Sequence, residues 1–179
     1  MIWSDGKCED TAFITVNDNC DCPAGDNNIN DPNLTVCKLL PETIITGNDA
    51  TPAGGTYRWE YANNGGAYTP AAGINNNRDF TTEVLNTGTH AFVRIYTVTV
   101  DNKECIYNSN EVSFSVNPEP VVTITGQNEI CDGKETEFVA SGGETYKWSS
   151  LEETASIFVR DNIERIVTVT DANGCSATA

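Results

Sequence analysis

The sequence has few basic residues, a single histidine and no long hydrophobic run. Its 10 lysines and arginines stand against 26 aspartates and glutamates, which gives a formal net charge of −16. Such a charge repels nucleic acid and anionic lipid, so we expect neither as a partner. Apolar residues come mostly in runs of two or three, too short to insert in a bilayer. The lone His90 has no paired nucleophile, so a catalytic triad is not expected.

Helical periodicity is nearly absent as well. Segments that alternate apolar and polar residues recur at short spacing, and Gly, Asn, Asp and Pro bound them. This pattern is typical of an antiparallel β-sandwich. The expected strands are 42–47, 56–62, 67–69, 79–85, 91–100 and 110–116, followed by 121–125, 135–140, 145–148, 156–160 and 165–170.

One sequence motif occurs twice. Tyr57-Arg58-Trp59 leads to an alternating strand and the turn Asp101-Asn102-Lys103-Glu104-Cys105, and Tyr146-Lys147-Trp148 leads to the turn Asp171-Ala172-Asn173-Gly174-Cys175. The chain also opens on a third tail, Asp5-Gly6-Lys7-Cys8. Self-similarity on this scale indicates tandem modules.

We therefore predict an all-β chain of tandem immunoglobulin-like β-sandwich modules in four parts. Residues 1–18 are the last strand of a preceding module or a donor strand, and 19–35 are a linker rich in Cys, Asn and Asp. Residues 36–117 form the first module, and 118–179 form a second module that lacks its final strand. Pro118 and Pro120 stiffen the joint between the modules because each fixes φ and removes a donor.

Seven cysteines suit modules this small. A module of about 60 residues is marginally stable without a covalent staple. Disulfides imply an oxidising compartment, so we expect an extracellular or cell-surface location. The first residues lack the basic start and apolar core of a secretory signal, so we expect the chain to be processed or excised from a longer protein.

The shared order of cysteine and tryptophan in the modules predicts disulfides Cys37–Cys105 and Cys131–Cys175. Four strands separate Cys131 from Cys175, which brings the chain back to the end where it began. The first bond rests on analogy with the second. Trp59 and Trp148 lie at strand centres opposite these bonds, which predicts core residues rather than sugar-stacking ones.

Several segments of the second module carry a family resemblance. They resemble the immunoglobulin-like and SprB-type repeats of Bacteroidetes surface proteins, and 57–66 resembles a longer variant. The resemblance implies a secreted or cell-surface protein, exported by the type IX route and often a large adhesin. The family has no catalytic residues to carry over, so we expect no enzymatic activity. The segments are Glu129-Ile130-Cys131-Asp132-Gly133, Ala140-Ser141-Gly142-Gly143, Tyr146-Lys147-Trp148-Ser149 and 167–179.

The linker holds the remaining cysteines and a cluster of oxygen ligands. Cys20 and Cys22 are too few ligands to predict a metal site, so disulfides among Cys8, Cys20 and Cys22 are favoured instead. The oxygen-bearing residues from Asp26 onward resemble the start of an EF-hand Ca²⁺ loop. The sixth residue of that loop would be Asp31 instead of Gly and the twelfth would be Cys37 instead of Glu, which excludes an EF-hand. A looser Ca²⁺ site is the alternative to a solvated linker with no cofactor. The oxygen-bearing residues are Asp26, Asn28, Asn30 and Asp31.

Two tyrosines and one threonine are the other candidate sites. Tyr61 and Tyr68 lie beside the Asn63-Asn64-Gly65-Gly66 turn and are predicted glycan contacts. Asp10-Thr11-Ala12 resembles the O-glycosylation sequon used by Bacteroidetes, with Thr11 as its acceptor.

The leading hypothesis is a structural and adhesive segment of an extracellular surface protein, whose partners are neighbouring repeats or copies of itself. One alternative is a self-assembling filament subunit in which residues 9–16 donate a strand to the incomplete second module. The other is an accessory glycan-binding module of a secreted enzyme, with surface glycans as partners.

Overall fold

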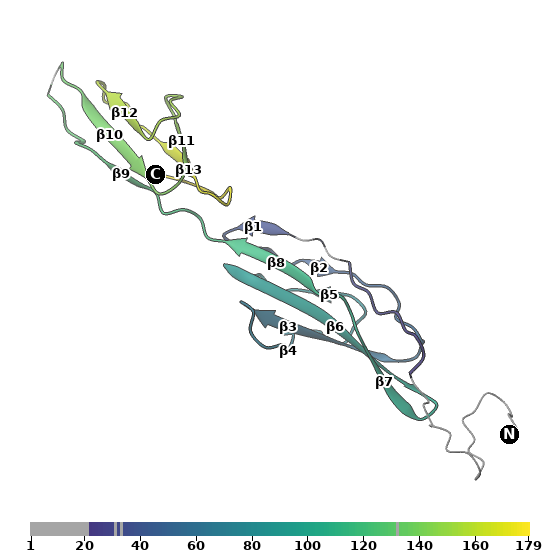
Figure 1. Cartoon of the computed structure of the whole chain (residues 1–179). Helices are drawn as coiled ribbons and strands as arrows, with labels where there is room; N and C mark the ends of the chain where they lie inside the picture. The colour runs from purple at the N-terminus through teal and green to yellow at the C-terminus, as the bar shows by residue number, and fades with distance from the viewer. Residues whose placement is uncertain (1–21, 31, 33, 132) are drawn as a thin grey trace, which may run out of the picture.

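The computed structural model describes residues 22–30, 32, 34–131 and 133–179. Within these residues every regular element is a strand, which confirms the all-β prediction, and none is a helix that could cross a membrane. Figure 1 shows two groups of strands set end to end and joined by one connector. We call residues 22–117 the first unit and 118–179 the second unit.

The first unit is built on one long strand, β6 (Gly88–Val100). On one side β6 pairs antiparallel with β3 (Thr56–Asn63), which continues to β4 (Thr69–Pro70). On the other side β8 (Val112–Asn117) pairs with its first half and β7 (Lys103–Asn108) with its second. Strand β1 (Thr35–Cys37) extends the sheet alongside β8. A separate two-stranded antiparallel sheet pairs β2 (Ile44–Ile45) with β5 (Phe80–Thr81).

Alternation along β3 and β6 creates the core of the first unit. Successive side chains of a strand point to opposite faces, so every second residue of β6 enters the core. Trp59 of β3 is fully buried and stacks on Phe80, with ring centroids 5.5 Å apart. Phe92 of β6 packs on Phe80 and edge-on against Phe114 of β8. Aromatic rings from β3, β5, β6 and β8 therefore form one continuous cluster.

We call residues 22–36 the strap, and its described residues run along the outer edge formed by β7 and β8. Tyr107 donates its hydroxyl to the carbonyl of Pro23, and Asn110 exchanges two hydrogen bonds of 2.9 Å with the backbone of Ile29. Further along, Ser115 donates its N–H to Leu34, and β1 pairs in parallel with β8. The strap thus belongs to the first unit, which differs from the predicted linker at 19–35, whose residues 19–21 lie outside the described range.

Arg94 fastens the strap and two loops to the core. Its guanidinium is fully buried, and Nε donates to the side-chain oxygen of Asn27 at 2.8 Å. Nη1 donates to the carbonyl of Arg78 at 2.7 Å, and Nη2 donates to the carbonyls of Asn28 and Asn48 at 3.1 and 3.0 Å. Its partners are amide oxygens from three segments that are distant in the sequence.

Aromatic rings complete the environment of Arg94. The guanidinium carbon lies 4.7 Å from the ring centre of Tyr57 and 5.8 Å from that of Trp59, a cation–π arrangement. Burial lowers the pKa of Arg94, while Tyr57 and Asp79 nearby oppose that shift. Arg94 keeps its charge despite this shift because the guanidinium of arginine is not deprotonated in proteins.

The second unit consists of two three-stranded sheets. One has the order β12-β10-β9, with β9 (Thr123–Thr125), β10 (Thr136–Ser141) and β12 (Ser156–Val159). The other has the order β11-β13-β14, with β11 (Thr145–Trp148), β13 (Val167–Thr170) and β14 (Ser176–Thr178). Trp148 is 1% exposed and packs with Ile157, Val167 and Val169. The sequence patterns did not predict β14, which pairs with β13 after a tight turn.

The connector between the units is short and held at both ends. Strand β8 ends at Asn117 and β9 begins at Thr123. Lys38 donates its N–H to the carbonyl of Asn117 at 2.7 Å, and its ammonium lies 3.1 Å from Glu119. The end of β1 therefore touches the point where the chain leaves the first unit.

Replacing Arg94 with alanine should strongly destabilise the first unit. The change leaves oxygens of Asn27, Asn28, Asn48 and Arg78 without their donor. Since a buried unsatisfied oxygen costs about 1–3 kcal/mol, the free energy of unfolding should fall by at least about 3 kcal/mol in urea titrations. Arg58→Ala is the control, because this exposed side chain forms a surface ion pair with Glu60 and its loss should cost under about 1 kcal/mol. Equal losses for both variants would contradict the role assigned to Arg94.

Candidate functional site

The candidate site lies where the inward-facing rows of β3 and β6 reach the sheet end. The strand register places Trp59 opposite Arg94, Tyr61 opposite Phe92, and Asn63 opposite His90. These pairs lie on the same face because they are two residues apart along each strand. The row therefore runs from the buried arginine, through aromatic rings, to a polar mouth.

A pocket of about 250 Å³ opens at this mouth. Its floor is aromatic and buried, made by Phe80, Phe92, His90 and the partly buried Tyr61. Its rim is exposed and mostly polar, with Asn63, Glu83, Asn86 and Thr87. Small-ligand sites share this composition of apolar walls with a few placed polar groups.

Two hydrogen bonds engage both ring nitrogens of His90. Nε2 lies 2.8 Å from the carbonyl of Asn86, which only accepts, so Nε2 carries a proton. Nδ1 lies 2.8 Å from the hydroxyl of Tyr61 and accepts from it in the tautomer with its proton on Nε2. Burial raises the pKa of Tyr61, which keeps that hydroxyl protonated as a donor. The two rings also stack with an interplanar angle of 16°.

This arrangement suits binding better than proton transfer. Both nitrogens of His90 are engaged, so the imidazole has no free lone pair for a general base. Among the lining residues Glu83 is the sole carboxylate, and it lies at the exposed rim. The pocket offers a flat aromatic floor and rim groups that accept and donate hydrogen bonds.

Tyr68, the other predicted glycan contact, lies on the opposite face of the sheet. It lines a second depression with Ala62 and Ala91, which alternate with Tyr61 and Phe92 along their strands, and His90 is the residue that the two cavities share. Its hydroxyl donates to Glu111 at 2.5 Å, and burial together with that carboxylate raises the pKa of Tyr68 to about 12. Tyr61 and Tyr68 therefore do not form one site.

The disulfide pairing differs from the prediction. The structure joins Cys22 to Cys105 and Cys37 to Cys175, and Cys131 is free and exposed. Cys37, Cys105 and Cys175 are bonded as expected, but the pairs Cys37–Cys105 and Cys131–Cys175 are wrong. Cys22 was expected to pair with Cys8 or Cys20, and that expectation is wrong as well.

Strand direction explains why Cys37 does not pair with Cys105. Cys37 lies beside Asn117, at the end of the first unit next to the connector, whereas Cys105 lies twelve residues back along the β7–β8 edge. At about 3.3 Å per strand residue, the two ends are roughly 40 Å apart. A disulfide needs Cα atoms within about 7 Å. The strap brings Cys22 to the distant end instead, where its Cα lies 5.6 Å from that of Cys105.

Cys131 and Cys175 likewise lie at opposite ends of the second unit and therefore do not pair. Cys131 belongs to the loop between β9 and β10, at the end of the second unit away from the first (Figure 1). Cys175 belongs to the turn between β13 and β14, which faces the first unit. The turn cysteine therefore meets Cys37 across the junction rather than a cysteine of its own unit.

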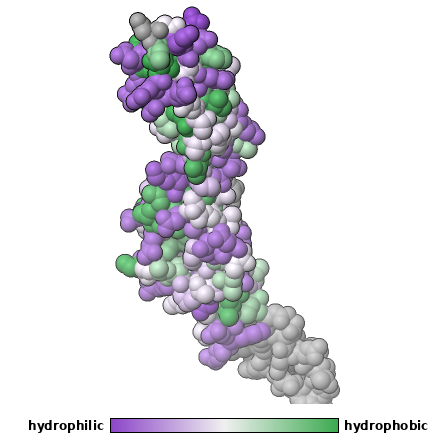
Figure 2. Space-filling model, turned by 90° about the vertical axis from the view of Figure 1, so that its left-hand side faces the viewer, coloured by the Kyte–Doolittle hydropathy of each residue, from purple (hydrophilic) through white to green (hydrophobic). Residues whose placement is uncertain are grey.

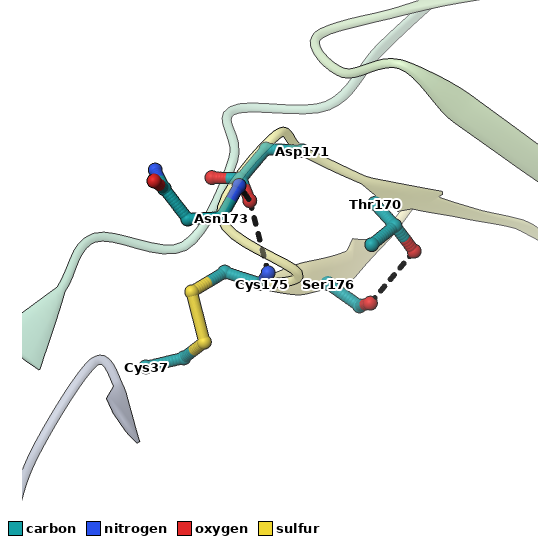
Figure 3. Close-up of a disulfide and its surroundings, with 6 residues drawn as sticks. All are labelled: Cys37, Thr170, Asp171, Asn173, Cys175 and Ser176. Carbon is teal, nitrogen blue, oxygen red and sulfur yellow. Dashed lines mark hydrogen bonds between the residues drawn. A yellow bond between two sulfur atoms is a disulfide. The ribbon is translucent and has the colours of Figure 1, made fainter. Parts of the chain in front are cut away.

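The turn that carries Cys175 is held by one aspartate (Figure 3). The carboxylate of Asp171 accepts the N–H groups of Asn173 and Cys175, each at 2.9 Å. Gly174 has a φ of +80°, a conformation that glycine adopts without strain. Beside the turn, the hydroxyls of Thr170 and Ser176 lie 2.8 Å apart. The repeated Asp-turn-Cys motif thus presents its cysteine in a fixed position.

Three of the predicted Ca²⁺ ligands, Asp26, Asn28 and Asn30, lie among the described residues. Asp26 accepts from the side-chain amides of Asn28 and Asn48, while the amide of Asn30 donates to Thr46. In the part of the chain that the structure describes, no group of three His, Cys, Asp or Glu side chains is placed to hold a metal ion. Asp31, Thr11, Cys8 and Cys20 lie outside the described residues.

Comparisons with known proteins add little to this geometry. No protein-family model and no curated protein sequence matches the chain. Among solved structures, the apo form of β-glucuronidase 3 from Bacteroides uniformis aligns with 88% of this chain at 10% identity and a TM-score of 0.29. The match spans 24% of that protein, so this chain corresponds to about a quarter of its length. A likeness at this level assigns neither fold nor activity.

Two features of the first unit were missed from the sequence. The pocket residues Phe80 and Glu83 belong to a segment read only as a strand, and nothing local connects them to His90. Arg94 did carry a signal, because it occupies an inward position between Phe92 and Tyr96 in an alternating strand. A charged residue at such a position is buried only with partners.

The pair of Tyr68 and Glu111 predicts pH dependence at both extremes. The pKa of Tyr68 is raised above its unfolded value near 10, so its contribution to stability is full below pH 10 and is lost as pH rises through about 12. The hydrogen bond from Tyr68 lowers the pKa of Glu111, so that contribution is present above about pH 4.3 and is lost on acidification. In Glu111→Gln, ultraviolet titration should show Tyr68 ionising at lower pH. An unchanged titration curve would refute the coupling.

Proposed function

We propose that this chain is a non-enzymatic structural segment of an extracellular surface protein, built to hold two β-sandwich units in a fixed end-to-end arrangement. The observation that carries the proposal is the Cys37–Cys175 bond, which ties the tip of the second unit to the edge of the first. A spacer needs defined geometry between units, and a covalent bond at their junction supplies it.

Non-covalent contacts at the junction support the same role. The parallel pairing of β1 with β8 places Cys37 beside Asn117, where the connector begins. Gly142 packs so closely on the connector that a Cβ there would clash with the carbonyl oxygen of Val121. The connector is therefore held by both units, and prolines at 118 and 120 restrict its backbone further.

Surface and redox chemistry favour an extracellular location. Two disulfides persist in an oxidising compartment and are rare in a reducing one. On the face in Figure 2, hydrophobic residues form separate small patches among hydrophilic ones. Scattered apolar residues of this kind are normal on a soluble surface.

Within this proposal we class both units as immunoglobulin-like and place the chain with the Bacteroidetes surface repeats that it resembles. Each unit has a buried tryptophan on a strand that pairs with the strand before the Asp-turn. A disulfide-bonded cysteine follows each turn aspartate by four residues, Cys105 in β7 and Cys175 just before β14. The order of strand, turn and cysteine is shared, while the loop lengths differ.

Removing the junction bond should make the two units move independently. In small-angle X-ray scattering, a Cys37→Ser, Cys175→Ser variant should show a broader distribution of distances than the wild type. Cys22→Ser, Cys105→Ser is the matched control, since that bond lies within the first unit and should leave the distribution unchanged. All three proteins would carry Cys131→Ser to prevent mispairing. Superimposable curves for the junction variant and the wild type would remove the basis of the proposal.

The tyrosine–histidine pocket favours glycan binding as a second candidate function. Sugars present flat apolar faces that stack on aromatic rings, and hydroxyls that need hydrogen-bond partners. The floor of Tyr61 and Phe92 with the rim of Glu83, Asn86 and Thr87 offers both in one cavity. The cavity is small, which fits a single sugar ring of a surface glycan.

Rim substitutions test this candidate without disturbing the core. On a glycan array, a saccharide bound by the wild type should bind at least about tenfold more weakly to Glu83→Ala, Thr87→Val, because the hydrogen-bonding oxygens of both side chains are removed. Tyr68→Phe, on the opposite face, is the control and should bind normally. Absence of any bound saccharide, or a larger loss in Tyr68→Phe, would contradict glycan binding at this pocket.

The filament alternative depends on residues 9–16, which lie outside the described residues, and it stays a prediction.

A further inference from the structure

We propose that the strap and the Cys37–Cys175 disulfide form a covalent bypass that carries tension past the sheets of both units, so that the chain bears load without being extended. The inference rests on the proposed role as a structural segment, because only such a segment is pulled at its ends. It follows from which cysteines are joined and how far apart they lie in the sequence.

The shortest covalent path from Cys22 to Ala179 avoids nearly all of the fold. It follows the strap to Cys37, crosses the disulfide to Cys175 and continues along the backbone to the last residue. The bond spans 138 positions of sequence, and everything between its cysteines lies off this path. Without disulfides the path would be about 157 residues long, with a stretched length of about 540 Å.

The strap is already almost fully extended in the folded protein. Its ends are fixed beside Cys105 and Asn117, which bound a stretch of about 12 residues, or about 40 Å, along the β7–β8 edge. The strap covers this distance with about 15 residues, so its slack is about three residues, or about 10 Å. Tension therefore reaches Cys37 after very little movement.

The two disulfides contribute unequally to this path. Loss of Cys22–Cys105 leaves the strap and the Cys37–Cys175 bond intact, so the shortest path is unchanged. Loss of Cys37–Cys175 diverts the load through Cys22–Cys105 and then along the whole backbone from Cys105 to Ala179. That route pulls on β7, β8 and the whole second unit.

Single-molecule stretching with handles at the two ends of the 179-residue chain tests the bypass. Each protein carries Cys131→Ser and is stretched until its contour length is constant. Cys37→Ser, Cys175→Ser should gain about 190 Å over the parent, since about 55 more residues of backbone enter the path. Cys22→Ser, Cys105→Ser should gain nothing. Final contour length is a covalent property, so the test holds even where a variant is less stable.

The outcomes separate this inference from the proposed function. No gain in the Cys37–Cys175 variant, or a gain in the Cys22–Cys105 variant, would overturn the bypass. The expected gains combined with flexible units in wild-type scattering would keep the bypass and reject the fixed spacer. A reductant added to the stretched parent should release a first step of the same size, about 190 Å, when Cys37–Cys175 is the bond that breaks.

Discussion

The buried guanidinium of Arg94 is the interaction on which the first unit depends. A charge without solvent is stable only when its donors are satisfied, and this one bonds oxygens from the strap and from the loops at residues 48 and 78. A Cβ on Gly47 would clash with the guanidinium, so the neighbouring loop can close only around glycine. By holding the strap, Arg94 also positions the segment that runs to both disulfides.

The strands were predictable where burial decides the pattern. Alternation around Trp59, Phe92 and Trp148 gave the centres of β3, β6 and β11 because each strand has one face in a core. Short edge strands such as β1 and β14 were missed, since three residues leave too little pattern to detect. Composition also misled at Asn27, whose side-chain amide suggests solvent but is buried and donates to the backbone carbonyls of Arg94 and Tyr107.

The cysteine partners could not be obtained from local sequence. Two cysteines can pair only when they lie at the same end of a unit or face each other across the junction. The end at which a cysteine lies depends on the directions of strands that are distant from it in the sequence. Cys37 and Cys131 occupy similar places in their modules by sequence, yet one lies at the junction and the other at a free end. The repeated Asp-turn-Cys motif did indicate that each cysteine is held in a fixed position, but it contained no information on the disulfide partner of that cysteine.

The candidate pocket and the stability of the first unit share one row of side chains. His90, Phe92 and Arg94 follow one another on the inward face of β6, so a change in the pocket floor also reaches the arginine network. The exposed rim is free of this constraint. Binding specificity at such a site would therefore vary through the rim residues while the floor stays fixed.

The backbone and the two disulfides also link this part of the chain into closed covalent loops. Cys22, Cys37, Cys105 and Cys175 are joined by three stretches of backbone and two disulfides, so two separate covalent routes connect any pair of them. A single backbone cut between Cys22 and Cys175 therefore leaves the two ends of this region attached. Exposed loops, where proteases cut most readily, can be nicked once without the protein coming apart.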